Sequence, residues 1–223
     1  LVLSGLLGFV VERVAPQATA LRAELDEAEV QQRTGARLHT SYLPARLRWL
    51  RETEPELVGQ VASWLSLGEY LLWQLTGERA VGTSTAAWSG LLDRRTGDWD
   101  PTMLEVAGIS PDQLAPVHHP DQPVRAPSER WPALAEASWF PVVADGYAAN
   151  IGSGATDART VVASFATSGA VRVRVPADIA ELPSGLWCYR LDAGHALLGG
   201  ALNDVGRAVS WLETTLQLDG VDL

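Results

Sequence analysis

The residue best suited to chemistry is Asp145, which stands between an apolar stretch and a run of small residues. Residues 142–144 read Val-Val-Ala, and residues 146–154 read Gly-Tyr-Ala-Ala-Asn-Ile-Gly-Ser-Gly. This order predicts an apolar strand that ends in a carboxylate, at a sharp turn where a ligand can approach the backbone closely. Such a carboxylate can accept a proton from a substrate hydroxyl during phosphoryl transfer. The alternative is that Asp145 only caps the helix that follows.

Two further segments rich in small residues are candidates for holding a phosphate group. Thr167, Ser168 and Gly169 lie between two strand-like stretches, where hydroxyls and backbone N–H groups can hold phosphate oxygens. Gly199 and Gly200, followed by Asn-Asp-Val-Gly at 203–206, predict another turn, ahead of a helix whose first N–H groups suit an anion. Taken alone, each segment fits an ordinary hairpin turn or a capped helix start at least as well.

Composition argues against several classes of protein. The chain has 27 Asp and Glu against 17 Lys and Arg, and its net charge of −10 argues against a nucleic-acid-binding protein. Cys188 is the single cysteine, and His118 and His119 lack acidic or Cys neighbours at metal-ligand spacing. We therefore expect no disulfide, no metal site and a cytoplasmic protein.

The apolar run at residues 1–11 is too short to span a bilayer and lacks the flanking residues of a signal peptide. A buried strand, or a sequence that continues upstream, explains it better, and we expect the second. No membrane association is expected.

Helices are expected through most of the first half. Apolar spacing with proline and glycine signals places them at residues 16–32, 44–51, 55–61, 66–75 and 101–107. Residues 110–138 are rich in proline and polar residues, which is typical of a surface connection.

The second half is expected to form a sheet. Residues 159–175 and 186–198 each have the pattern of a β-hairpin, and residues 203–216 that of a closing helix. The change in pattern predicts a domain boundary near residue 157, with a first domain at 1–157 and a second at 158–223.

Several segments occur in the order found in one enzyme family. The motifs are His-Thr-Ser-Tyr-Leu-Pro-Ala-Arg-Leu-Arg-Trp-Leu at 39–50, Trp-Leu-Ser-Leu-Gly-Glu-Tyr-Leu at 64–71, Thr-Ser-Thr-Ala-Ala-Trp-Ser-Gly-Leu-Leu at 83–92, Asp-Gly at 145–146, Thr-Ser-Gly at 167–169, and Cys-Tyr-Arg-Leu at 188–191 with Leu-Gly-Gly-Ala-Leu-Asn at 198–203. In this order they resemble the FGGY carbohydrate kinases across most of the chain. The last pair is similar to the gluconate kinase branch.

The resemblance implies an α/β fold, namely part of the actin/hexokinase-like (ribonuclease H-like) kinase fold, with a sugar-binding first domain and the start of an ATP-binding second domain. It implies ATP-dependent phosphorylation of a small sugar or sugar acid. Gluconate is the first choice, and a pentulose such as xylulose is the second. ATP and Mg²⁺ are the implied cofactors of the complete enzyme.

The resemblance also assigns site residues. Asp145 takes the place of the catalytic base. The further assignments are Thr167, Ser168 and Gly169 to the phosphate loop, Tyr42, His39 and Arg46 to the sugar, and Gly199 and Gly200 to the cofactor. For Arg46, the candidate anchor of a sugar carboxylate, a solvated helix face is the alternative.

The sequence departs from the family pattern in several places. It contains no Asp-x-Gly-Thr motif, Val11 stands where an acidic sugar contact is usual, and Ala166 replaces a glycine. The family's adenosine-binding Gly-Gly turn should lie beyond residue 223. We therefore expect a segment of a kinase that alone turns over ATP poorly. A non-catalytic remnant or sugar-binding module is the alternative.

Overall fold

The computed structural model describes residues 12–125, 129, 131–166, 168–202 and 204–216. The α-helices are α1 (Ala15–Glu24), α2 (Glu27–Thr34), α3 (Leu43–Thr53), α4 (Pro55–Val58), α5 (Leu67–Thr76), α6 (Thr83–Trp88), α7 (Pro101–Ala107), α8 (Asp145–Gly152) and α9 (Val205–Leu216). The strands are β1 (Val81–Gly82), β2 (Val117–His118), β3 (Val161–Phe165), β4 (Gly169–Pro176), β5 (Trp187–Arg190) and β6 (His195–Leu202). Three short 3-10 helices are η1 (Glu12–Val14), η2 (Pro111–Gln113) and η3 (Pro132–Leu134).

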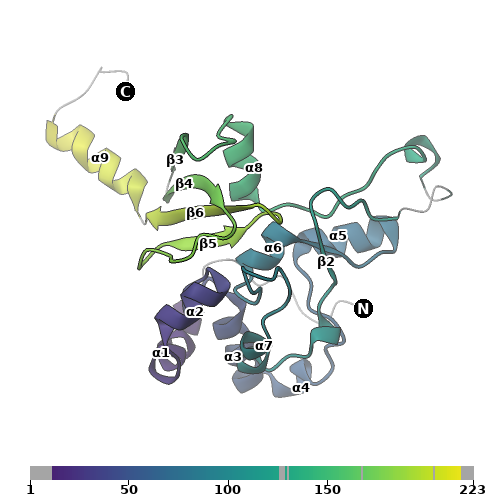
Figure 1. Cartoon of the computed structure of the whole chain (residues 1–223). Helices are drawn as coiled ribbons and strands as arrows, with labels where there is room; N and C mark the ends of the chain where they lie inside the picture. Colours follow the sequence, from purple (N-terminus) through teal and green to yellow (C-terminus); the bar gives the residue numbers. More distant parts are fainter. Residues whose placement is uncertain (1–11, 126–128, 130, 167, 203, 217–223) are drawn as a thin grey trace.

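The described residues form a helical part and a sheet that pack together. Figure 1 shows α1, α2, α3 and α7 gathered on one side of the sheet of β3 to β6, with α6 next to the sheet and α9 extending away from it. The expected order, mostly helix before residue 138 and a sheet at 159–198, is confirmed.

The single helix expected at residues 16–32 is in fact two helices. Leu25 leaves the helical conformation, and the Asp26 side chain accepts hydrogen bonds from the backbone N–H groups of Ala28 and Glu29. This N-cap starts α2 in a new direction, since an aspartate offers the first N–H groups of a helix the acceptor they lack. The apolar spacing runs through the break and conceals it.

The helical part has one main apolar core. Leu21 of α1, Leu47 and Leu50 of α3, and Met103 and Leu104 of α7 all belong to it and are buried. α3 packs directly against both α1 and α7. The burial of these large side chains is the chief source of stability in this part of the chain.

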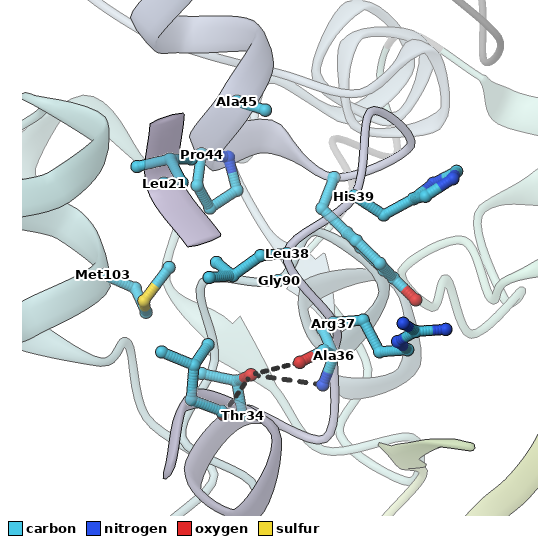
Figure 2. A pocket seen from close by; sticks show the side chains of 12 residues that line it. Leu21, Thr34, Ala36, Arg37, Leu38, His39, Pro44, Ala45, Gly90 and Met103 are labelled. Carbon is cyan, nitrogen blue, oxygen red and sulfur yellow. Dashed lines mark hydrogen bonds between the residues drawn. The ribbon is translucent and has the colours of Figure 1, made fainter. Parts of the chain in front are cut away.

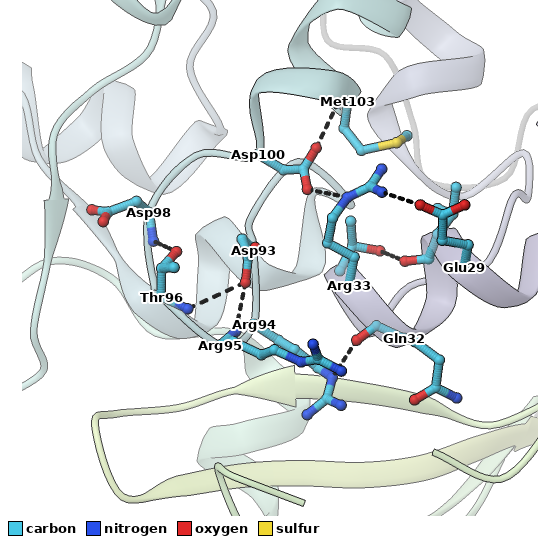
Figure 3. A network of polar contacts seen from close by, with 12 residues as sticks. Glu29, Gln32, Arg33, Asp93, Arg94, Arg95, Thr96, Asp98, Asp100 and Met103 are labelled. Carbon is cyan, nitrogen blue, oxygen red and sulfur yellow. Dashed lines mark hydrogen bonds and ion pairs between the residues drawn. The ribbon is translucent and has the colours of Figure 1, made fainter. Parts of the chain in front are cut away.

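An ion pair joins α2 to the start of α7. The carboxylate of Asp100 is only 1% exposed, caps α7 by accepting from the Met103 N–H at 2.8 Å, and lies 2.5 Å from Arg33 Nε (Figure 3). Arg33 also pairs with the exposed Glu29 at 3.3 Å. The buried carboxylate therefore has partners on both oxygens, which is the condition for keeping a charge inside a protein.

The four-stranded sheet is fully antiparallel, with the order β3-β4-β6-β5. Both expected hairpins, β3-β4 and β5-β6, are confirmed. The turn expected at Gly199 and Gly200 is wrong, because both residues lie inside β6 and pair with Arg172 and Val171 of β4. Small residues here serve packing, since a Cβ on Gly199 would lie 2.5 Å from the Trp187 ring.

The sheet packs onto the helical part at a close backbone contact. Gly35 ends α2 with φ +72°, and its carbonyl accepts a hydrogen bond from the Cys188 N–H at 2.7 Å. A Cβ on Gly35 would lie 1.8 Å from the Cys188 carbonyl oxygen. Only glycine satisfies both the left-handed conformation and this approach of β5. Cys188 itself is fully buried, as expected of a small apolar residue.

The closing helix α9 is present, but it buries none of its residues, and Trp211 on it is 64% exposed. Among the described residues, no helix has the length and hydropathy needed to cross a bilayer.

The boundary expected near residue 157 falls between α8 and β3, where helix gives way to sheet. It stays a prediction. The apolar run at residues 1–11 lies outside the described residues.

Candidate functional site

Asp145 is the first residue of α8, and its position is set by hydrogen bonds to α6. Thr85 Oγ1 donates to the Val142 carbonyl at 2.8 Å, and the Ala144 N–H donates to Ser84 Oγ at 3.2 Å. The strand expected before Asp145 is therefore wrong: residues 141–144 are in no strand, because α6 side chains take the hydrogen bonds that a neighbouring strand would need. The Asp145 carboxylate is exposed and accepts a hydrogen bond from the Gly146 N–H at 2.6 Å.

A positive charge lies against the first turn of α8. A Cβ built on the buried Gly146 would lie 3.1 Å from Arg172 Nε and 3.4 Å from the Trp88 ring. Arg172 comes from β4, and its Nη1 donates to Ser164 Oγ on β3 at 3.1 Å. The sheet thus places a guanidinium next to the residue that follows Asp145. Guanidinium groups suit phosphate and carboxylate ligands because their N–H donors form a planar fork.

An aromatic cluster connects the first turn of α8 to the start of α3. The Tyr189 ring stacks with Trp187, at 4.5 Å between centroids, and with Trp88, at 5.5 Å. The Tyr189 hydroxyl lies 2.6 Å from the Tyr42 hydroxyl. Burial raises the pKa of both phenols above the ordinary value, so both hydroxyls stay protonated at neutral pH.

The predicted phosphate loop lies at the tip of the β3-β4 hairpin. Ser168 is exposed, and its carbonyl accepts a hydrogen bond from the Ala166 N–H at 3.0 Å. Gly169 begins β4, and a Cβ there would lie 2.7 Å from the Ser164 carbonyl oxygen and 2.9 Å from Val205 of α9. The tip and the start of α9 are therefore neighbours. Thr167 lies outside the described residues.

Strand β4 runs from the hairpin tip to the residue that contacts the first turn of α8. Gly169 is the first residue of β4, and Arg172, which contacts the first turn of α8, is the fourth. At ~3.3 Å per residue, these two positions lie roughly 10 Å apart along the strand. The hairpin tip and Arg172 therefore lie on the same strand, and Arg172 connects that strand to the first turn of α8, which begins at Asp145.

The three residues predicted to contact the sugar lie at and just before the first turn of α3, and each side chain has a different hydrogen-bond partner. Tyr42 is buried and its hydroxyl is paired with Tyr189. His39 is exposed and its Nδ1 lies 3.0 Å from Ser41 Oγ, while Arg46 Nε donates to the Thr40 carbonyl at 3.0 Å. Burial, with the charges of nearby arginines, lowers the pKa of His39.

His39 and Tyr42 both border a cavity between α1, α2 and α3, shown in Figure 2. Its volume is about 10 Å³. This volume holds about one water molecule at most, so the cavity cannot admit a sugar. Of the predicted set, Tyr42 is linked through Tyr189 to the Trp88 ring, whereas His39 and Arg46 contact Ser41 and the Thr40 carbonyl.

The side chains that could bind magnesium are oxygen ligands, chiefly carboxylates. Within the described ranges, no group of three or more His, Cys, Asp or Glu side chains could hold a metal ion. Mg²⁺ prefers oxygen ligands in octahedral geometry, and Asp145 alone offers too few of them. The described residues do not fit a resident Mg²⁺ site.

Sequence reasoning missed Arg172 and Trp88 as site residues. The alternation Val171-Arg172-Val173-Arg174 predicts a strand with one polar face, and Arg172 stands on that face. The alternation identifies the face, but only the fold reveals that α8 covers it.

Comparison with known proteins places this arrangement in a family. The profile of the FGGY family of carbohydrate kinases, N-terminal domain, matches residues 9–134, which is more than half of the chain. The chain belongs to the FGGY family of carbohydrate kinases. Gluconokinase from Bacillus subtilis is 26% identical over 202 residues, covering 87% of this chain and 39% of the relative. The FGGY chain thus spans about two fifths of that relative's length.

Solved structures of sugar kinases superpose on this chain. A xylulose kinase from Rhodospirillum rubrum superposes with a TM-score of 0.81 at 26% identity, covering 93% of this chain and 43% of that one. A gluconate kinase from Lactobacillus acidophilus gives a TM-score of 0.79 at 26% identity, covering 90% of this chain and 42% of that one. The predicted fold class, part of the actin/hexokinase-like kinase fold, is confirmed.

Proposed function

We propose that this chain supplies the sugar side of an ATP-dependent carbohydrate kinase, with gluconate as the first-choice substrate and a xylulose-like pentulose as the second. The observation that carries the proposal is the position of Asp145 at the start of α8, next to the Arg172 guanidinium, in a chain of the FGGY family. The gluconokinase and gluconate kinase relatives support the choice of gluconate, and the xylulose kinase neighbour supports the alternative.

In this proposal Asp145 is the general base. Its exposed carboxylate accepts the proton of the sugar hydroxyl as that oxygen attacks the terminal phosphorus of ATP. The bond from this phosphorus to the oxygen that bridges it to the next phosphate breaks, and ADP leaves. Arg172 donates hydrogen bonds to the oxygens of the transferring group, where negative charge must be held. Ser168 and the backbone at Gly169 receive phosphate oxygens at the hairpin tip, together with Thr167. No step is assigned to Mg²⁺.

The other predicted residues have lesser roles in this proposal. Tyr42 orients Tyr189 and thereby the aromatic floor beside Asp145, rather than reaching the sugar itself. Gly199 and Gly200 are cofactor contacts by family resemblance, and Gly199 also makes room for the Trp187 ring. His39, which precedes α3, and Arg46, in its first turn, stay predictions for the sugar.

Two measurements test the proposal, both on a full-length FGGY kinase that contains these 223 residues, because the segment alone is expected to turn over ATP poorly. Calorimetry with gluconate and with xylulose measures sugar binding, and transfer of labelled phosphate from ATP in the presence of magnesium measures catalysis. Asp145→Asn is expected to keep sugar binding and to lower transfer by ~10²–10⁴-fold. Glu105→Gln, an exposed carboxylate on α7, is the matched control and should change neither.

The outcomes separate the alternatives. Sugar binding without any sugar-dependent transfer by the unmodified full-length protein would favour a binding module over a kinase. Transfer that is equal in Asp145→Asn and the unmodified chain would remove Asp145 from the mechanism. Tighter binding of xylulose than of gluconate would reverse the choice of substrate.

A further inference from the structure

A second cavity lies between the loop before α7 and the face of the sheet opposite to the one on which Tyr189 stacks with Trp88. It has a volume of about 430 Å³, which is within the range of small-molecule sites. Its charged lining consists of Arg94, Arg95 and Arg190 with a single carboxylate, Asp178, so that its net charge is +2. We call it the basic cavity. A positive site of this size stands out in a chain whose net charge is −10.

The arginines of the basic cavity are held in place by backbone groups. Arg94 Nε donates to the Gln32 carbonyl at 2.8 Å (Figure 3), and its Nη1 donates to the Ile179 carbonyl at 2.9 Å. Arg190 Nη1 donates to the carbonyls of Arg94 and Arg95, each at 2.8 Å. The cavity thus joins the loop before α7, the loop after β4 and the end of β5, and its donors are fixed before any ligand arrives.

No carboxylate among the described residues forms an ion pair with the arginines of the basic cavity. Arg94 is 1% exposed, yet its Nη2 has no hydrogen-bond partner there. None of Arg94, Arg95 and Arg190 forms an ion pair with a described carboxylate within 4.0 Å. The Nη2 atom itself is closed to solvent, so it adds to the positive charge behind the cavity wall, and the exposed guanidinium of Arg95 is the donor that a ligand can reach directly.

The basic cavity is distinct from the candidate kinase site. Successive residues of a strand point to opposite faces of the sheet, and Tyr189 of β5 faces Trp88 and α6. Arg190, the next residue, therefore points to the other face. Asp145 and Arg172 do not line the cavity.

We propose that the basic cavity binds a dianionic phosphate group, either free or carried by a small metabolite. A net charge of +2 matches a phosphate dianion, and guanidinium forks bind tetrahedral oxyanions through paired hydrogen bonds. Because the lining comes from both the helical part and the sheet, the ligand fastens the two together. This proposal is independent of the kinase function.

Calorimetry on the full chain tests the proposal, with inorganic phosphate, ribose 5-phosphate and citrate as probes. We expect saturable binding of one equivalent of phosphate or ribose 5-phosphate and a rise in melting temperature on binding. A preference for ribose 5-phosphate would identify a phosphorylated metabolite, and equal affinities would identify the phosphate group alone. Tighter binding of citrate than of either phosphate would overturn the phosphate assignment in favour of a carboxylate ligand.

Variants locate the binding site. Arg95→Gln removes an exposed guanidinium that forms no ion pair with a described carboxylate, and Ala180→Glu adds a carboxylate at an exposed rim position. Each should weaken phosphate binding about tenfold or more without changing the melting temperature of the free protein. Arg159→Gln, an equal change of charge at an exposed turn outside the cavity, should leave binding unchanged.

Two results would overturn the proposal. One is the absence of saturable phosphate binding up to ~10 mM, which is weaker than any specific site of this charge should be. The other is binding that Arg172→Gln abolishes and that Arg95→Gln leaves intact, since the phosphate would then occupy the candidate kinase site.

Discussion

The hydroxyl groups of Tyr42 and Tyr189 lie 2.6 Å apart, although 147 residues separate the two tyrosines in the sequence. One belongs to the start of α3 in the helical part, and the other to β5 in the sheet. Their hydrogen bond is buried and joins the helical part to the sheet.

Tyr42→Phe should lower the free energy of unfolding by about 1–2 kcal/mol, because it leaves the buried Tyr189 hydroxyl without a partner. The double variant Tyr42→Phe with Tyr189→Phe should be at least as stable as the single one, since no orphaned hydroxyl remains. Urea unfolding measures both. Tyr70→Phe, a half-buried tyrosine on α5, is the control, and a Tyr42→Phe cost no greater than this control would contradict the expectation.

Asp100→Ala should cost about 3 kcal/mol of stability or more, because it removes the cap of α7 and leaves Arg33 without its buried partner. Glu29→Gln removes the exposed partner of the same arginine and should cost less than ~1 kcal/mol. The ratio of the two losses in free energy of unfolding, measured with denaturant, reports how much burial increases the contribution of a carboxylate that pairs with Arg33. Similar costs would mean that Asp100 contributes only through surface charge.

Gly35→Ala should be more damaging than Gly77→Ala. Both glycines end helices with positive φ, so both substitutions carry a backbone penalty of about 1 kcal/mol. The Gly35 variant also places a methyl group against the Cys188 carbonyl, whereas nothing lies within 4 Å of a Cβ on Gly77. The difference between their melting temperatures therefore measures the packing of β5 on α2. Equal losses would show that this backbone contact can relax.

Cys188 should give the protein a specific loss of stability at alkaline pH. Burial raises the pKa of its thiol to about 11, with the Arg94 charge acting in the opposite direction. An unfolded thiol titrates near ~8.5, so the folded state keeps a proton that the unfolded state has lost. The free energy of unfolding should therefore fall by about 1.4 kcal/mol per pH unit between these two pKa values, as the pH rises.

The Cys188→Ala variant isolates this effect, because all other titrating groups are common to both proteins. The stability difference between the two proteins should be constant below pH ~8 and change between ~8.5 and 11. A constant difference across the whole range would mean that the thiol is not buried in solution. Slow reaction with a thiol reagent at neutral pH, accelerated by urea, is the corresponding chemical readout.

Local signals predicted much of the fold. Pro101 and Gly108 mark the ends of α7, the β3-β4 hairpin follows from β-branched alternation, and the β5-β6 hairpin follows from the turn at residues 192–194. The break at Asp26 was missed because apolar spacing continues across it, while the cap depends on one side chain. Family order, more than local pattern, identified Asp145.

The rest of the site depends on contacts between distant segments. Arg172 reaches Gly146 only because β4 pairs in one register and α8 packs on that face of the sheet. Gly199 was predicted to lie in a turn, because a glycine pair is common in turns, whereas here it gives room to the indole ring of Trp187, its partner on the neighbouring strand β5. Neither contact leaves a signal in the neighbouring residues.

The stacking of Tyr189 with Trp88 and Trp187 has a mechanical consequence. Trp88 belongs to α6 and the other two rings to the sheet, and the interplanar angles are 14° and 10°. Nearly parallel rings resist being pulled apart but slide over one another at little cost. A small shift of α6 along the ring planes would therefore keep the stacking contact, whereas a separation would lose it, and the Tyr42–Tyr189 hydrogen bond opposes both.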